Sequence, residues 1–237
     1  MTTETRPAAQ SADQHAARSL TRGLLLAAGG AIAALAVFLL VVASVTTESG
    51  LYRFDARAHD VVYHAVGPQR QALAIGVTWF GNNATVTALV ALVAAALVVA
   101  RRRMLAVRVV IASGVGGLVV LGLKTLFQRA RPLDQVIPAT GYSLPSGHAW
   151  ASAVFYGMMI YLLWRLVPSR AVRVLATAGL VALILAVGLS RVYLNVHFLT
   201  DVVAGWASGT AWLVGVLVAV RVAEERWAAR RASRVVA

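Results

Sequence analysis

Hydrophobic residues along this chain gather into long runs that are separated by short polar segments. From Gly23 to Thr47, for example, no side chain is ionisable. About 20 apolar residues suffice to cross the hydrocarbon core of a bilayer. Runs of this kind lie at about 22–46, 76–100, 104–123, 149–167, 171–189 and 199–221. The pattern therefore predicts an all-α polytopic membrane protein, built as a bundle of six transmembrane helices.

Two of the runs leave alternatives open. The second is interrupted near its start by Gly81-Asn82-Asn83, a break that can separate a short interfacial helix from the span itself. The first ends on Val42-Ala43-Ser44, which resembles the cleavage site of a signal peptide. Its apolar core is longer than the usual 7 to 15 residues of such peptides, which favours a retained span.

Glycine and tryptophan positions refine the expected helix contacts. Small residues let membrane helices approach closely, and the third run contains Gly114, Gly116, Gly117 and Gly122. Indole rings prefer the membrane interface, and Trp79 and Trp150 fall near the ends of runs. We therefore expect close packing of the third helix and interpret both tryptophans as interfacial anchors.

The two ends of the chain differ from the spans in composition. Residues 1–20 are rich in Thr, Ala, Gln and charge and lack an apolar stripe, so we expect a disordered cytoplasmic tail there. Residues 21–222 would form the six-helix membrane domain, and residues 223–237 a basic cytoplasmic tail.

Composition supports a membrane protein. Hydrophobic residues make up 59% of the chain, charged residues 13%, and the mean hydropathy is +0.75, which disfavours a compact soluble fold. The net charge of +13 would suggest nucleic-acid binding in a soluble protein. Here the arginines flank apolar runs, as the positive-inside rule requires, so we expect no nucleic-acid partner. The absence of cysteine excludes disulfides and thiolate metal sites.

The arginines also set the orientation of the spans. They gather at 101–103, 165–173 and in the C-terminal tail, on the side that also holds the N-terminus if six spans alternate. That side is predicted to be the cytoplasm. Segments 47–75, 124–147 and 190–198 then lie outside.

Three polar clusters interrupt the apolar pattern, all on the predicted outer side. Their residues are Lys124, Arg129, Arg131 and Pro132; Pro145-Ser146-Gly147-His148; and Ser190-Arg191 with His197 and Asp201. Because successive helices alternate in direction, the end of the third span, the start of the fourth and the turn between the fifth and sixth meet one face. Separate clusters can thus form one site.

The side chains of these clusters suit a phosphate group. Arginine binds phosphate oxygens in a fixed fork and lysine adds a point charge, which fits Lys124, Arg131 and Arg191. A helix that begins after Pro145 would also offer unpaired N–H groups near Ser146 and Gly147, and helix N-termini bind anions.

The histidines of the clusters suit catalysis. His197 and Asp201 are four residues apart, so on a helix they would share one face. The aspartate would orient the ring and leave its other nitrogen free as a nucleophile. His148 comes from another helix and could act as general acid. Taken singly, the cations could be interface anchors and Ser146-Gly147 a helix cap. Their common face favours a site.

Together the clusters resemble the three-part signature of the type 2 phosphatidic acid phosphatase superfamily. Its parts are Lys124, six residues, Arg131-Pro132; Pro145-Ser146-Gly147-His148; and Ser190-Arg191, five residues, His197, three residues, Asp201. The resemblance implies that His197 attacks phosphorus, Asp201 orients it and His148 protonates the leaving alcohol. It also implies phosphate binding by Lys124, Arg131, Arg191, Ser146 and Gly147, without metal or other cofactor.

The expected function follows from this resemblance. We expect a multi-pass membrane phosphatase, typical of a bacterial cell membrane, with an outward-facing site and both termini cytoplasmic. Its substrate would be a membrane lipid phosphate: phosphatidic acid, phosphatidylglycerol phosphate or a polyprenyl pyrophosphate. One alternative is a lipid phosphotransferase with the same phosphohistidine, and another a non-enzymatic lipid transporter or binding protein. The spans argue against the soluble vanadate haloperoxidases that share the signature. The sequence leaves the oligomeric state open.

Overall fold

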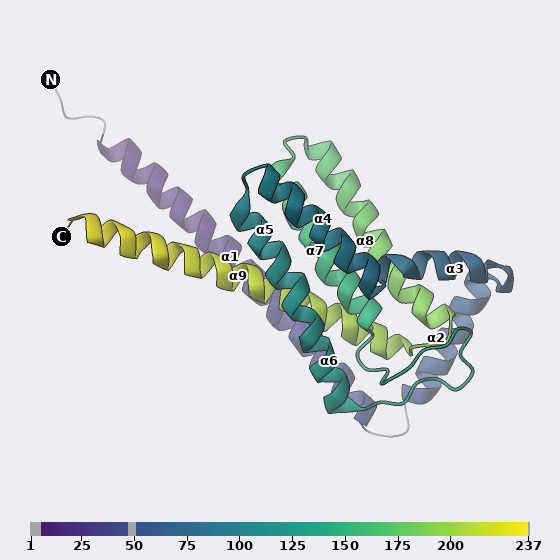
Figure 1. Ribbon diagram of the computed structural model, residues 1–237. Helices are drawn as coiled ribbons and strands as arrows, with labels where there is room; N and C mark the ends of the chain where they lie inside the picture. The colour runs from purple at the N-terminus through teal and green to yellow at the C-terminus, as the bar shows by residue number, and fades with distance from the viewer. Residues whose placement is uncertain (1–5, 47–50, 237) are drawn as a thin grey trace.

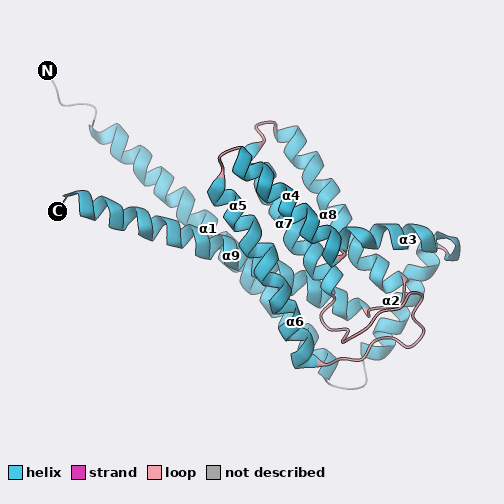
Figure 2. Ribbon diagram, in the orientation of Figure 1, coloured by secondary structure: helices cyan, strands magenta, loops and turns pink. Residues whose placement is uncertain are grey.

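The computed structural model describes residues 6–46 and 51–236, and within these ranges the chain forms helices and loops but no strand (Figure 2). The α-helices are α1 (Arg6–Thr46), α2 (Leu51–Val66), α3 (Gln71–Thr78), α4 (Asn83–Val99), α5 (Arg103–Val110), α6 (Gly116–Phe127), α7 (Gly147–Leu166), α8 (Arg170–Tyr193) and α9 (Leu199–Val236). Two 3₁₀ turns, η1 (Pro68–Arg70) and η2 (Trp79–Gly81), and one π-helical stretch, η3 (Ile111–Val115), join them.

The apolar segments confirm the predicted six-helix bundle, with one span broken. Five continuous segments are long and apolar enough to cross a membrane: Leu25–Val45, Arg103–Phe127, Gly147–Leu166, Arg170–Tyr193 and Leu199–Trp227. The sixth consists of Pro68–Gly81 and Asn83–Val99, which are bent by 46° relative to each other. Asn82 lies at the bend, and its side chain accepts a hydrogen bond from the N–H of Ala84 (2.9 Å) as the cap of α4. The predicted break is therefore present.

Helices α1 and α8 present apolar side chains outward. Leu25 on α1 is 68% exposed and Leu175 on α8 is 73% exposed. Such surfaces are costly in water but suit hydrocarbon. Helix α1 runs alongside α9 (Figure 1), so its inner face is covered by protein and its outer face is left for lipid.

The interior is organised around α7, which packs against both α8 and α9. Trp150 is 3% exposed, and a Cβ added at Gly116 would overlap its ring. The close packing expected of the third helix thus occurs at Gly116, whereas Gly114, Gly117 and Gly122 face open space. The interpretation of Trp150 as an interfacial anchor is wrong, because the absence of a side chain at Gly116 lets its ring enter the core. Trp79 is 58% exposed.

Both terminal segments contain helix. Helix α1 begins at Arg6, within the 1–20 segment for which disorder remains a prediction. The segment is rich in alanine and contains no glycine, a composition that favours helix. Helix α9 likewise continues to Val236 through the basic tail. Residues 1–5 of the expected tail lie outside the described residues.

One end of the bundle gathers the irregular parts of the chain. Helix α2, the long loop between α6 and α7, and the turn between α8 and α9 lie together there, and the start of α1 and the end of α9 lie at the opposite end (Figure 1). The segment between α1 and α2 (47–50) falls outside the described residues. This gathered end contains all three polar clusters.

Candidate active site

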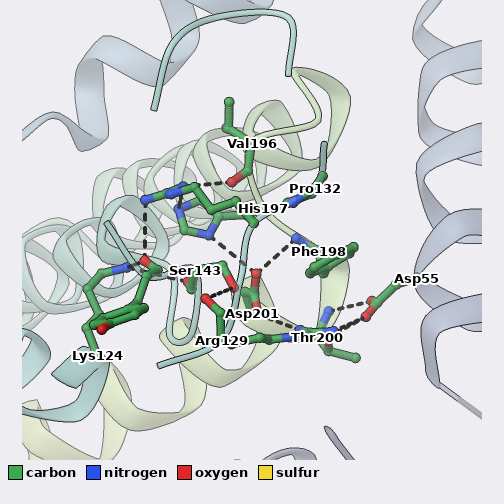
Figure 3. Close-up of polar contacts among 12 residues, drawn as sticks. Asp55, Lys124, Arg129, Pro132, Ser143, Val196, His197, Phe198, Thr200 and Asp201 are labelled. Carbon is green, nitrogen blue, oxygen red and sulfur yellow. Dashed lines mark hydrogen bonds and ion pairs between the residues drawn. The ribbon is translucent and has the colours of Figure 1, made fainter. Parts of the chain in front are cut away.

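The structure brings the three predicted clusters together at this end of the bundle. Figure 3 shows Lys124 of the first cluster beside His197 and Asp201 of the third. The last turn of α6 contributes Lys124, the loop after it Arg131, the start of α7 Ser146 to His148, the end of α8 Arg191, the turn before α9 His197, and the first turn of α9 Asp201. Alternating helix directions therefore produced the common face that the sequence predicted.

His197 itself does not lie on a helix, which corrects the expected geometry. It belongs to the turn at 194–198, and α9 begins two residues later at Leu199. Asn195 turns the chain with a φ of 50°. The N–H groups of Val196 and His197 then both donate to the carbonyl of Arg191, at 3.2 and 3.3 Å. Asn195 forces the turn because its left-handed backbone cannot continue a helix.

The ring of His197 lies between the carboxylate of Asp201 and the guanidinium of Arg131. Its Nδ1 is 3.4 Å from Oδ2 of Asp201, and its Nε2 is 3.1 Å from Nη1 of Arg131. A guanidinium only donates, so Nε2 carries the lone pair and Nδ1 the proton. The side chain is only 3% exposed, and this burial lowers the pKa of His197 to about 4, with Asp201 opposing the shift. The ring is therefore neutral at neutral pH.

Asp201 is fixed from two further directions. It is fully buried, its Oδ2 accepts the N–H of Phe198 at 3.0 Å, and its Oδ1 accepts Nη1 of Arg129 at 2.5 Å. Buried carboxylates require such partners because desolvation penalises the charge. The acid that faces His197 is thus held in place by hydrogen bonds that do not involve the histidine.

The two cations nearest His197 bind the loop before α7. Lys124 donates to the carbonyl of Tyr142 (2.5 Å). Arg131 donates from Nε to the carbonyl of Gly141 (2.9 Å) and from Nη1 to that of Val196 (2.7 Å). Lys124 also lies beside Gly147, because a Cβ at that glycine would be 3.9 Å from Cε of the lysine. Lys124 therefore borders the N-terminus of α7, and Arg131 borders the turn that holds His197.

That N-terminus is tied to α9 through backbone contacts. The N–H of Ser146 donates to the carbonyl of Asp201 at 2.9 Å. One turn further along α9, a Cβ at Gly205 would lie 2.6 Å from the carbonyl oxygen of Ser146, so only glycine permits this approach. The hydroxyl of Ser146 is buried and finds no hydrogen-bond partner within the described part of the chain. A bound anion would supply one.

Arg191 and His148 complete the set. Arg191 is 5% exposed and its Nη1 donates to Oγ1 of Thr78 at 2.9 Å, which anchors α8 to α3. His148 packs on Gly81, where an added Cβ would approach it to 3.2 Å. The charged or polar groups within electrostatic range of His148 are Arg191, His197, Arg131 and Lys124. All eight predicted site residues thus lie in one region, and their roles remain predictions.

Three residues of the site were not assigned by sequence. Arg129 lies within the first polar cluster but received no role there, and Asp55 and Thr200 received no attention. Asp55 contacts Arg129 across 74 residues and Thr200 across 145 residues of sequence. No local spacing rule could connect them. The available signal was one of three carboxylates, Glu48, Asp55 and Asp60, in a segment that borders an apolar span.

Comparisons with known proteins point to one family. A model of the PAP2 superfamily matches residues 104–225. Phosphatidylglycerophosphatase B of Bacillus subtilis (strain 168) is 27% identical over 177 residues, which cover 73% of this chain and 86% of that protein.

Two solved structures share the fold. A transmembrane PAP2-type phosphatidylglycerolphosphate phosphatase from Bacillus subtilis superposes with a TM-score of 0.73 at 24% identity, covering 78% of this chain and 93% of that one. Aquifex aeolicus LpxE superposes with a TM-score of 0.57 at 19% identity, covering 72% of this chain and 96% of that one.

Proposed function

Because this chain belongs to the PAP2 superfamily, we propose that it hydrolyses a lipid phosphate monoester or pyrophosphate through a phosphohistidine formed on His197. A PAP2-type membrane lipid phosphatase is the class on which the family, the relative and the fold agree. The particular chemistry rests on one observation, the ring of His197 held with Nδ1 toward Asp201 and Nε2 beside Arg131.

In the first step the lone pair of Nε2 attacks phosphorus. The bond from phosphorus to the leaving oxygen breaks, that oxygen keeps the electron pair, and His148 supplies its proton. The imidazole becomes positively charged as the P–N bond forms. Asp201, already 3.4 Å from Nδ1, stabilises that charge without moving.

In the second step water attacks the phosphorus of the phosphohistidine. His148 takes the proton of the water, the P–N bond breaks, and its electron pair returns to Nε2. For a monoester, the sum is lipid phosphate plus water giving lipid alcohol plus inorganic phosphate. For a pyrophosphate, the lipid product is the monophosphate instead. Both histidines return to their starting states, so no further reactant is required.

The phosphate oxygens would be held by charges and dipoles already in place. Arg131 touches the attacking nitrogen, Lys124 borders Gly147, and Arg191 approaches from α8. The unpaired hydroxyl of Ser146 and the N–H groups that begin α7 add donors at a helix N-terminus. Preorganised donors of this kind stabilise the charge that develops in the transition state.

A lipid substrate agrees with two neighbouring cavities beside the site. An apolar cavity of about 280 Å³ between α1, α2 and α9 is lined by Leu40, Phe54 and Val203. A second cavity, of about 380 Å³, is lined by Arg129 and Arg131. Leu51 lines both cavities. A lipid tail in the first cavity and a phosphate near the second would let the substrate enter sideways from the bilayer.

Phosphate release decides the proposal. Purified protein in detergent with chelator is given phosphatidylglycerol phosphate, phosphatidic acid or a polyprenyl pyrophosphate, and phosphate and labelled lipid products are both measured. We expect phosphate release from at least one lipid, abolished by His197→Ala and kept by His64→Ala, a control on the exposed side of α2. Turnover retained by His197→Ala would overturn the proposal, and label transferred to a second lipid would make the protein a phosphotransferase.

The orientation needs its own experiment, since we propose that the site faces outward. The chain contains no cysteine, so a single introduced thiol reports its side of the membrane. Leu133→Cys lies beside the site at a position that is 94% exposed, and Ser169→Cys precedes α8 at the other end of the bundle. An impermeant thiol reagent added to intact cells should label only the first. The reverse pattern would place the site inside.

A further inference from the structure

Arg129 lies between two buried carboxylates that come from different helices (Figure 3). Its Nη1 donates to Oδ1 of Asp201 at 2.5 Å, and its Nη2 donates to Oδ2 of Asp55 at 2.9 Å. The side chains of both acids are fully inaccessible, and that of the arginine is 15% exposed. One guanidinium therefore connects α2 to the acid that faces His197.

Thr200 and Phe198 hold this arrangement in one geometry. The N–H of Thr200 donates to Oδ1 of Asp55 at 3.0 Å and its hydroxyl to Oδ2 at 2.7 Å. The guanidinium carbon of Arg129 lies 4.1 Å from the ring centroid of Phe198, a distance at which cation–π attraction is effective. Both carboxylate oxygens of Asp55 are thus bonded, and Arg129 is fixed by its hydrogen bonds and by an aromatic ring.

The charges of the three ionised side chains leave one negative charge. Two carboxylates and one guanidinium sum to −1, in a buried setting where charges interact strongly. In the proposed reaction the imidazole of His197 gains one positive charge when phosphorus bonds to Nε2. The network therefore matches the charge that the reaction creates. Without Asp55, Arg129 would neutralise Asp201, and without Arg129 two buried acids would stand close together.

We propose that Asp55 and Arg129 are positioning residues, which fix the carboxylate of Asp201 and set the net negative charge it presents to His197. The inference rests on the proposed role of His197 as nucleophile. Neither residue needs to touch the phosphate. Their loss should therefore reduce the rate of the chemical step and leave substrate binding nearly unchanged.

The other charged or titratable groups around His197 belong to several elements. They are Lys124 of α6, Arg131 and Asp134 of the following loop, His148 of α7, Arg191 of α8 and, on α2, Tyr52, His59 and Asp60. Changes at Asp55 and Arg129 leave all of these in place. Differences among the variants below therefore report the charge of the pair itself.

The first experiment compares kcat, KM and the acid limb of the pH profile for Asp55→Asn and Arg129→Gln. We expect kcat to fall on the order of 10- to 100-fold in each, as for other residues that orient a reacting group, with KM changed less than about threefold. Burial lowers the pKa of His197 to about 4. Loss of a negative charge should move the acid limb lower in Asp55→Asn, and loss of a positive charge should move it higher in Arg129→Gln.

The double variant Asp55→Asn/Arg129→Gln tests the charge balance directly. It removes one negative and one positive charge, so the acid limb should return close to its wild-type position although kcat stays low. A merely structural role predicts something else, because loosened packing would admit water and move every variant toward the ordinary histidine pKa near 6.5. Acid limbs that all move upward together would overturn the proposal.

Two further variants keep the test decisive if Arg129→Gln does not fold. Arg129→Lys retains the charge but cannot bridge two carboxylates, so it should lower kcat with the acid limb unmoved. The matched control is Glu224→Gln, which makes the same change in the Arg108–Glu224 pair within the described helices and far from the site. If Asp55→Asn and Arg129→Lys alter kcat no more than Glu224→Gln does, the proposal is wrong. Absence of phosphate release by the wild type would instead refute the proposed function.

Discussion

Nη1 of Arg131 lies 3.1 Å from Nε2 of His197, so the nitrogen expected to attack phosphorus is already in contact with a cation that we expect to bind phosphate. Arg131 also donates to the carbonyls of Thr140, Gly141 and Val196. Its guanidinium is thereby held with one edge toward the nucleophile. A phosphate that reaches Nε2 must meet this cation.

Arg131→Lys should lower phosphate release about 100-fold. A compact ammonium cannot replace a fork that contacts the loop carbonyls and the phosphate together, and loss of one preorganised donor costs on the order of 10²–10³ in kcat. The measurement is kcat on the preferred lipid. Arg221→Lys, in an exposed pair with Glu225, is the control and should keep full activity. Equal activities of the two variants would exclude Arg131 from phosphate binding.

Ser146→Ala and Ser169→Ala should behave in opposite ways, although both serines precede a helix. The hydroxyl of Ser169 accepts the N–H of Val172 at 3.4 Å, so its loss should lower stability by up to about 1 kcal/mol and spare activity. Ser146 makes no such cap. Its loss should spare stability and lower kcat on the order of 10-fold, because a hydrogen bond to a charged group is removed.

Thermal unfolding and phosphate release, measured on both serine variants, distinguish the two cases. Ser169→Ala serves as the control for loss of a helix-capping hydroxyl. A Ser146→Ala protein that unfolds at a lower temperature and releases phosphate at the wild-type rate would show that Ser146 is an ordinary helix cap.

Gly205→Ala should damage the site through helix packing. The added methyl would lie 2.6 Å from the carbonyl oxygen of Ser146 and 3.0 Å from Cβ of Ala149, so the start of α7 must move. Overpacking of this kind costs about 1–3 kcal/mol, and displaced donors should lower kcat at least about 10-fold. Gly215→Ala on the same helix meets nothing within 4 Å and should be neutral. Activity of Gly205→Ala at the wild-type level would contradict the close approach.

The buried neutral His197 should make stability depend on pH. Burial lowers its pKa from 6.5 to about 4 in the folded protein. Between these values the unfolded chain binds a proton that the folded chain does not, so stability rises with pH through this window and falls as pH drops from 6.5 to 4. The difference corresponds to roughly 3 kcal/mol. This stabilisation is fully present above pH 6.5, the pKa of histidine in the unfolded chain.

Unfolding temperatures measured from pH 4 to 7 check this window. His197→Gln, which cannot titrate, should show a smaller pH dependence than the wild type. His64→Gln, at an exposed position, is the control. Curves of equal slope for wild type and His197→Gln would mean that the histidine is solvated.

The sequence predicted the spans and the common face of the clusters, because these follow from the apolar runs and from the alternating directions of the helices. Apolar length sets each span, and alternation of helices sets where Lys124, His148 and His197 meet. The placement of His197 on a helix was wrong, since the four-residue spacing to Asp201 fits a turn as well as a helix. Trp150 entered the core because Gly116 leaves space for it, which no property of the tryptophan itself reveals.

Asp55 illustrates a different limit. Its segment forms α2, which packs against α8 and α9, and its partners are distant in sequence. A carboxylate in a polar segment normally remains solvated. Only the tertiary placement of Arg129 turns Asp55 into part of the site, and pair contacts of this range are invisible to periodicity.

The backbone bond from Ser146 to the carbonyl of Asp201, with Gly205 packed against it, ties the start of α7 directly to the acid that faces His197. Lys124 and Arg131, by contrast, donate hydrogen bonds to loop carbonyls that a phosphate can replace. A bound phosphate should therefore replace loop carbonyls at cations that already surround the site, while His197 keeps its position.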